Sequence, residues 1–99
     1  MTSKQRAYLK SISSTYDPIF QIGKGSITPE MVNAVSEALE KRELIKISVL
    51  QNCADDPKEL AQILSERTRS SVVHVIGKKI VLYKPNSNKD KRKIILPVG

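Results

Sequence analysis

The segment Gly23-Lys24-Gly25-Ser26 is the part of this sequence best suited to bind an anion. Glycines let the backbone approach a ligand closely and permit positive φ. The lysine adds a positive charge, and the Ser26 hydroxyl is a donor for a phosphate oxygen. A helix that begins at Thr28 would point its N–H groups and positive dipole end toward the same place. The segment therefore predicts a phosphate-binding loop, and an ordinary strand-to-helix turn is the alternative.

The other groups that carry out chemistry in proteins do not assemble into a recognisable site. The loop lacks the third glycine of a dinucleotide fingerprint and the Gly-Lys-Ser/Thr ending of a P-loop. His74 is the only histidine, and Cys53 has no histidine near it in sequence. The acidic pair Asp55-Asp56 is explained by Asp56 as a helix N-cap rather than by a catalytic or metal-binding role. We therefore expect no enzyme activity, no metal site, no cofactor and no small-molecule substrate.

Further basic residues occur at three other places. Arg6 and Lys10 are four residues apart, which puts them on one face of a helix. Lys78 and Lys79 fall at the tip of an expected hairpin. These four residues are candidates to extend a phosphate contact, and solvated surface charge is the alternative. The C-terminal segment carries a run of bases that is typical of an electrostatic arm: Lys89, Lys91, Arg92 and Lys93.

The net charge of +7 is unevenly distributed along the 99 residues. It is +3 over residues 1–25, −2 over residues 26–70 and +6 over residues 71–99. If the two ends fold side by side, they produce one basic face, which is typical of a protein that binds a polyanion. The single cysteine and the lack of a long apolar run favour a reduced, cytoplasmic protein without a membrane span.

Three helices are expected to position these residues. The first covers residues 2–13, with a capping box between Thr2 and Gln5. The second begins with Thr28 as its N-cap and Pro29 at its first position, and the third begins at Asp56, with Glu59 closing a capping box, and runs to Thr68. Their periodicity predicts these buried residues: Met31, Val32, Val35, Ala38 and Leu39 in the second helix, and Leu60, Ala61, Ile63 and Leu64 in the third.

Four strands are expected, over residues 19–22, 44–50, 72–76 and 80–83. The last two form an antiparallel hairpin, in which His74 faces away from Val73 and Val75. The element order α-β-α-β-α-β-β predicts a compact α/β domain with a mixed four-stranded sheet. The domain is expected to cover residues 1–85, and residues 86–99 to form a flexible basic tail with a candidate edge strand over 94–96.

Several blocks in this order resemble the bacterial YhbY proteins, the stand-alone form of the CRM (chloroplast RNA splicing and ribosome maturation) domain. The N-terminal blocks are Lys4–Leu9, Asp17–Ile19 and Gln21–Gly25, and the later ones are Ala38–Lys46 and Val75–Tyr83. The resemblance implies an RNA-binding fold similar to the C-terminal domain of bacterial translation initiation factor three. It also implies that the protein binds the precursor of the large ribosomal subunit and assists its assembly.

The resemblance assigns the RNA contact to a Gly-Lys-Gly-Gly loop, here Gly23, Lys24 and Gly25, with Ser26 in place of the last glycine. The loop is analogous to the Gly-x-x-Gly loop of KH domains, which clamps a nucleic-acid backbone. The expected partner is therefore ribosomal RNA, bound by a monomer without catalysis. A protein–protein adaptor whose basic face meets an acidic partner remains the alternative.

Overall fold

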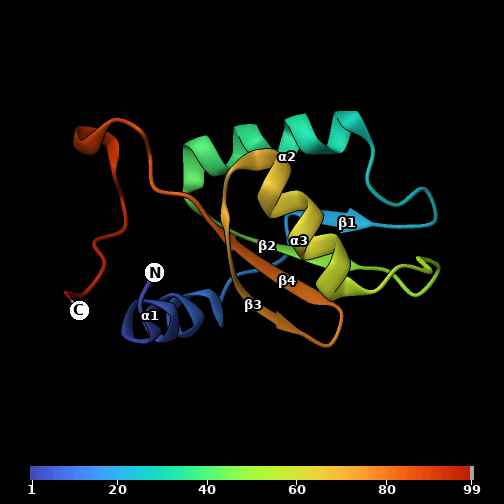
Figure 1. Cartoon of the computed structure of the whole chain (residues 1–99), viewed down its shortest axis with the longest axis horizontal. Helices are drawn as coiled ribbons and strands as arrows, with labels where there is room; N and C mark the ends of the chain where they lie inside the picture. The colour runs from blue at the N-terminus through green and yellow to red at the C-terminus, as the bar shows by residue number, and fades with distance from the viewer. Residues whose placement is uncertain (99) are drawn as a thin grey trace.

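A computed structural model describes residues 1–98, which form three α-helices, four β-strands and one short 3₁₀ helix (Figure 1). The elements in chain order are α1 (Ser3–Ser13), β1 (Phe20–Ile22), α2 (Pro29–Arg42), β2 (Leu44–Val49), α3 (Pro57–Thr68), β3 (Ser71–Ile76), β4 (Lys79–Tyr83) and η1 (Lys89–Lys91). The expected α/β fold and its element order are thus confirmed.

The four strands form one mixed sheet in the order β1-β2-β4-β3. β1 and β2 are parallel, with Phe20 opposite Ile47, and α2 is the crossover between them. β4 lies between β2 and β3 and is antiparallel to both. β2 and β3 are connected through α3 but are not neighbours in the sheet. The β3–β4 hairpin folds back and places β4 between them. This arrangement puts the ends of β1, β2 and β3 and the start of β4 at the same end of the sheet.

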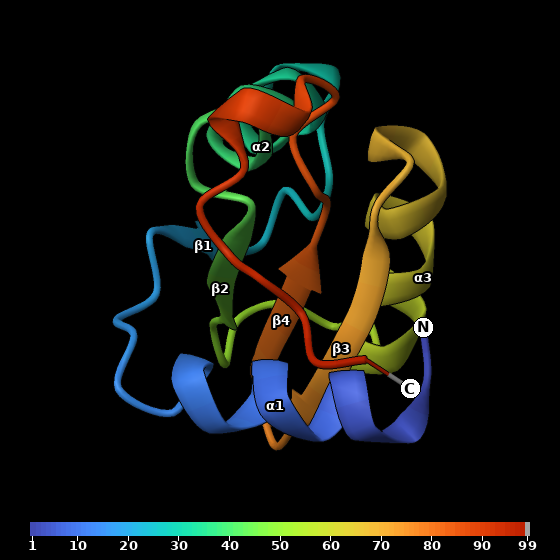
Figure 2. The ribbon, with the colours of Figure 1, turned by 90° about the vertical axis from the view of Figure 1, so that its left-hand side faces the viewer.

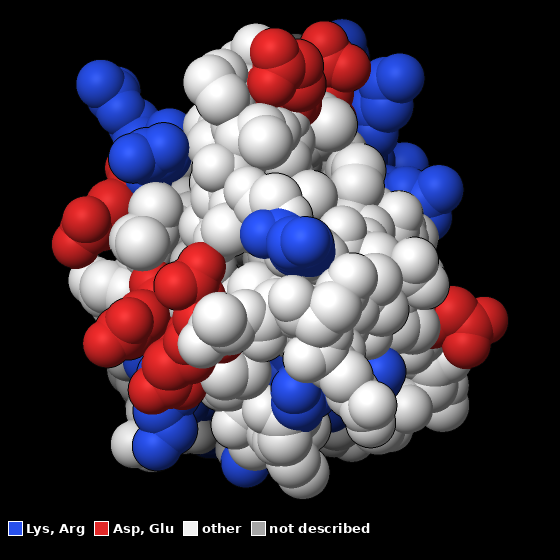
Figure 3. Space-filling model, turned by 90° about the vertical axis from the view of Figure 1, so that its right-hand side faces the viewer, with Lys and Arg blue, Asp and Glu red and all other residues white. Residues whose placement is uncertain are grey.

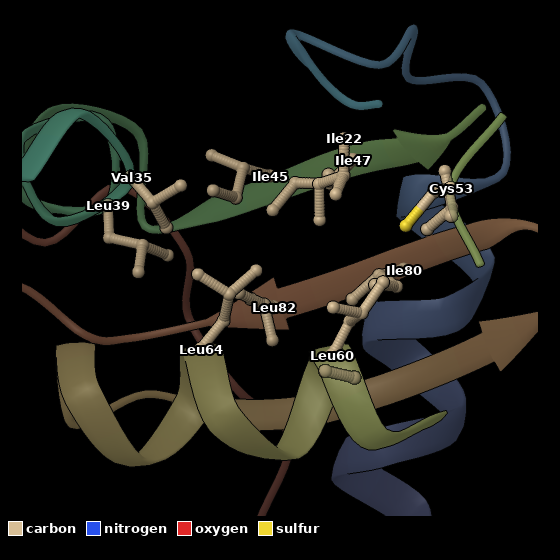
Figure 4. Close-up of a cluster of buried hydrophobic side chains, with 12 residues drawn as sticks. Ile22, Val35, Leu39, Ile45, Ile47, Cys53, Leu60, Leu64, Ile80 and Leu82 are labelled. Atoms are coloured by element: carbon tan, nitrogen blue, oxygen red, sulfur yellow. The ribbon is translucent and has the colours of Figure 1, made fainter. Parts of the chain in front are cut away.

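One face of the sheet packs against α2 and α3 and holds the larger part of the core (Figure 4). Val35 and Leu39 of α2 and Leu60 and Leu64 of α3 are at most 1 % exposed. They meet the inward-facing strand residues, which are Ile22, Ile45, Ile47, Val49, Ile80 and Leu82. Cys53 is buried in the same cluster. Aliphatic side chains thus supply nearly all of this core.

The opposite face of the sheet is covered by α1 and by the C-terminal segment (Figure 2). Leu9 of α1 is fully buried against Leu44, Val73, Val81 and Tyr83. Ile12, Ile94 and Leu96 pack around this second cluster. The molecule therefore has three layers, with α2 and α3 on one side of the sheet and the two ends of the chain on the other.

The helix starts follow the local signals in the sequence. Thr2 and Gln5 form the expected reciprocal capping box at α1. The Thr28 hydroxyl accepts a hydrogen bond from the Met31 N–H, and Pro29 occupies the first position of α2. At α3 the capping box expected with Glu59 is wrong, because the Asp56 carboxylate accepts from the Lys58 N–H instead.

Two expectations about side-chain direction are also wrong. Ile63 is 38 % exposed, because it lies beside rather than on the inward stripe of α3. Val73 and Val75 do not share a face, because a β-bulge between Val72 and His74 places an extra residue in β3. Val73 therefore joins the cluster under α1, whereas Val75 packs with α2 and α3.

Residues 86–98 return across the sheet and are fixed to it by Glu43, which is 1 % exposed. One Glu43 carboxylate oxygen accepts the backbone N–H groups of Lys93 and Ile94, and the other accepts that of Asn86 at 2.8 Å. The candidate strand over 94–96 is wrong, since these residues adopt no regular structure. The expected flexibility of the tail stays a prediction, to be weighed against these contacts.

Candidate functional site

The loop between β1 and α2 forms a tight turn, in which the Ser26 N–H donates to the Gly23 carbonyl at 2.9 Å. The positive φ expected of the glycines occurs instead at Ser26, where φ is 56°. This left-handed conformation favours glycine. A Cβ built at Gly25 meets no atom within 4 Å, so this glycine leaves open space at the tip of the loop. Lys24 is exposed beside it.

The Ser26 hydroxyl is already engaged within the protein. It donates to Asp55 Oδ2 at 2.5 Å, which ties the loop to the segment between β2 and α3. The expected hydrogen bond from Ser26 to phosphate would have to replace this one. The contact also places a carboxylate beside the loop. Sequence reasoning assigned Asp55 no partner, because the two loops meet only through the pairing of β1 with β2.

The N-terminus of α2 offers a phosphate fewer donors than its sequence indicates. Pro29 has no N–H, and the Met31 N–H is donated to the Thr28 hydroxyl at 3.2 Å. Glu30 in the first turn adds a negative charge. The helix dipole still favours an anion at this end, but the carboxylate of Glu30 opposes it.

The sheet topology brings the loop and the β3–β4 turn to the same end of the molecule, at the right of Figure 1. Lys78 and Lys79 are exposed at this turn. The Lys79 ammonium donates to the Ser48 hydroxyl at 3.0 Å, and the Lys78 carbonyl accepts the Val49 N–H at 2.7 Å. These contacts fix the backbone of the turn against β2 and leave the Lys78 side chain exposed.

Arg6 and Lys10 lie elsewhere, on α1. They line a groove of about 350 Å³ that runs along β3 between α1 and α3, together with Lys58, Gln62 and His74. Two cations of α1 and one of α3 thus line the same groove along the edge strand β3. The eight predicted residues therefore form two groups, one at the loop end of the sheet and one in this groove.

The His74 side chain in this groove is uncharged at neutral pH. Burial lowers the pKa of His74 below its ordinary value of 6.5, and the positive charges of Lys10 and Lys46 lower it further. Lys46 and His74 both lie opposite Val81 in the sheet, so the three residues form one row across it. His74 is thus held neutral among lysines.

The loop end of the molecule carries charges of both signs (Figure 3). The largest group of acidic side chains lies at the lower left of this view, and basic side chains occur at several places around and between the acidic ones. Asp55, which contacts the loop through Ser26, is exposed, and so are Asp56 and Glu59, which follow it in the chain. The expected basic face is therefore not found here. The two chain ends do fold side by side, since the Gln5 side-chain amide donates to the Pro97 carbonyl at 3.1 Å, and α1 and the C-terminal segment lie on the same side of the sheet (Figure 2).

Within residues 1–98, no three histidine, cysteine, aspartate or glutamate side chains lie together as a metal site would require. Cys53 is buried in the core, and Asp56 caps α3. Over the same residues, no helix has the length and apolar character needed to span a bilayer.

Comparisons with known proteins place these features in a family. The family model "CRS1 / YhbY (CRM) domain" matches residues 1–84. "Probable RNA-binding protein YqeI" of Bacillus subtilis is 46% identical over 97 residues, which are 98% of this chain and 99% of that protein. An "RNA-binding protein" of Haemophilus influenzae is 27% identical over 97 residues, which are 98% of this chain and 95% of that protein.

The fold is also similar to a solved structure. The solution structure of hypothetical protein SAV1595 from Staphylococcus aureus superimposes with a TM-score of 0.79 and is 52% identical in sequence. The match covers 98% of this chain and 99% of that one. The similarity thus includes the C-terminal segment beyond residue 84 as well as the three-layered domain.

Proposed function

The chain belongs to the CRS1/YhbY (CRM) domain family, and on this premise we propose that it is an RNA-binding protein that contacts the phosphate backbone. The observation that carries the proposal is the agreement along the whole chain with relatives named RNA-binding proteins. The separation of charge supports it, because a basic surface is what phosphates require. Arg6 and Lys10 belong to α1 on one side of the sheet, and Lys89 and Arg92 of the tail line a hollow beside Tyr83 on that side, whereas Lys91 lies next to Glu40 and Lys41 of α2.

The loop Gly23–Ser26 is proposed as one phosphate contact. Gly25 leaves the backbone accessible at the tip of the loop, and Lys24 supplies an exposed cation. The hydrogen bond between Ser26 and Asp55 holds the loop in place before RNA arrives. Arg6, Lys10, Lys78 and Lys79 are proposed as further contacts with the backbone.

A salt titration tests the loop contact. Binding to RNA weakens as salt increases, so a plot of log K against log salt has a negative slope. Each phosphate contact that is lost makes this slope shallower by about 0.7–0.9. Lys24→Gln should produce this loss on binding to a structured fragment of large-subunit ribosomal RNA. Lys41→Gln is the matched control, because Lys41 is exposed at the far end of α2 and its loss changes the net charge equally. Equal slopes for the two variants would refute the loop contact.

The RNA is proposed to be ribosomal RNA of the large-subunit precursor, and the protein to assist assembly as a monomer without catalysis. The resemblance to YhbY proteins is the basis of this part. In a cell lysate the protein should sediment with large-subunit precursors and be released by nuclease. Retention on its partners after nuclease treatment would instead favour the adaptor. RNA cleavage that requires a metal ion and is lost in Asp55→Asn would overturn the absence of catalysis.

A further inference from the structure

A second concave surface lies at the opposite end of β2 from the glycine loop. It is a hollow of about 430 Å³, formed by the segment between α1 and β1, the end of α2, the first half of β2 and the tail. The functional groups around it are Tyr16, Asp17, Ile19, Arg42, Lys46 and Lys93. None of these residues belongs to the phosphate contacts proposed above. The surface therefore offers a separate place for a ligand.

The hollow exists because β1 is shorter than β2. β1 pairs only with Ile47–Val49, and the last contact beyond it is the Ile19 N–H donated to the Lys46 carbonyl at 2.9 Å. The first half of β2 therefore has no strand beside it on this edge. The chain between α1 and β1 swings outward next to it (Figure 2). This swing leaves the side chains of Tyr16 and Ile19 at the rim, 39 % and 37 % exposed.

The buried Glu43 fixes the basic side of the hollow. Its carboxylate holds the backbone N–H of Lys93, so the tail passes the hollow at a defined place. Arg42, which precedes Glu43, lies on the same rim. Lys46 completes a set of three cations, opposed by the single carboxylate of Asp17. The local excess of positive charge thus sits beside an exposed aromatic ring.

An aromatic ring, an aliphatic side chain and three cations around one hollow suit a ligand that combines a flat base with a phosphate. Bases stack on aromatic side chains, and cations track the backbone, in proteins that bind unpaired nucleic acid. The volume lies within the range of about 300–1,000 Å³ typical of small-ligand sites. A base-paired duplex does not fit, because its bases are stacked on one another and not free to enter.

We propose that this hollow binds one unpaired nucleotide of the RNA, with its base against the Tyr16 ring and its phosphate between Arg42, Lys46 and Lys93. The site rests on the proposed RNA-binding function and adds a preference for unpaired segments to it. The two contact regions are separated by the length of β2, about 17 Å at ~3.3 Å per residue. An RNA that occupies both must therefore present an unpaired nucleotide about this far from the phosphate held by the loop.

The absence of tryptophan from the sequence allows a direct test. A Tyr16→Trp variant carries a single tryptophan at the rim of the hollow. A short unstructured RNA should quench its fluorescence, whereas a fully paired duplex should not. Tyr16→Ala should weaken binding of the unstructured RNA by at least about fivefold, the lower end of the effect of losing one stacked base. Tyr16→Phe, which keeps the ring, should bind like the wild type.

Tyr8→Ala is the matched control, because Tyr8 is 40 % exposed on α1 and does not line the hollow. It should leave the affinity unchanged. If the wild type binds RNA but Tyr16→Ala binds it equally well and no quenching is seen, the nucleotide site is refuted and the proposed function stands. If the wild type binds neither the unstructured RNA nor the duplex, both proposals fail.

Discussion

Glu43→Gln tests how the C-terminal segment is attached to the domain. Glu43 follows α2 directly with φ at 65°, and its carboxylate is almost fully buried. It accepts three backbone N–H groups of the tail, those of Asn86, Lys93 and Ile94. Burial raises the pKa of Glu43, but these hydrogen bonds and the charge of Arg92 lower it more, so its net pKa lies below the ordinary value.

The size of the effect follows from the hydrogen bonds. A hydrogen bond to a charged group contributes about 1.5–3 kcal/mol. Glutamine keeps one carbonyl oxygen for Lys93 and Ile94 but turns an NH₂ group toward the Asn86 N–H, where two donors then face each other. One charged hydrogen bond is lost and two are weakened, a total of about 3 kcal/mol. In a domain of this size, such a loss lowers Tm by roughly 12–24 °C.

Thermal unfolding followed by circular dichroism measures the change, with Glu37→Gln on the exposed side of α2 as the control. The pH dependence gives a second readout. Because the folded-state pKa of Glu43 lies below 4.5, the wild type keeps this stabilisation above about pH 4.5 and loses it as the pH falls through the folded-state pKa. Glu43→Gln should lack that part of the acid dependence.

A chain truncated after Pro85 tests whether the stability lost in Glu43→Gln comes from the contacts of Glu43 with the tail. It should be destabilised by a similar amount, and Glu43→Gln in this shorter chain should cost much less than in the full chain. If the shorter chain is as stable as the full one and Glu43→Gln changes Tm by less than the control does, the reasoning is refuted. The tail would then be the flexible arm that its composition predicts.

Three further outcomes are expected. Leu9→Ala removes a fully buried side chain under α1 and should cost about 2–5 kcal/mol in urea unfolding, and a loss below about 1 kcal/mol would contradict the packing. Burial, Lys10 and Lys46 lower the pKa of His74, so stability should fall as the pH drops below about 6.5; melts of His74→Gln should lack this fall. Arg6→Gln combined with Lys10→Gln should lower the salt slope for RNA by about 1.4–1.8, and an unchanged slope would exclude the α1 contact.

The elements of the fold were predictable because their signals are local. The capping box of Thr2 and Gln5 and the Thr28-Pro29 start act within one helical turn. The short link between β3 and β4 likewise determines their antiparallel pairing. Such signals depend on neighbouring residues alone, so one sequence is enough to read them.

The sequence-based predictions failed where the structure depends on contacts between residues that are far apart in the sequence. The bulge in β3 reverses the direction of Val73, and alternation along the strand gives no sign of it. The carboxylate of Glu43 finds its partners about fifty residues later, in a segment whose charge run is typical of a mobile arm. At the candidate site, the loop and its lysine were predicted, but the bond from Ser26 to Asp55 depends on how two loops meet at the end of the sheet.

The topology explains how a charge pattern along the chain becomes a pattern on the surface. The basic ends of the chain, α1 and the tail, cover one face of the sheet, and the acidic middle supplies α2 and α3 on the other. Glu43, an acid from that middle part, holds the tail on the basic side. Its contacts therefore concentrate positive charge on the face where the proposed function needs it.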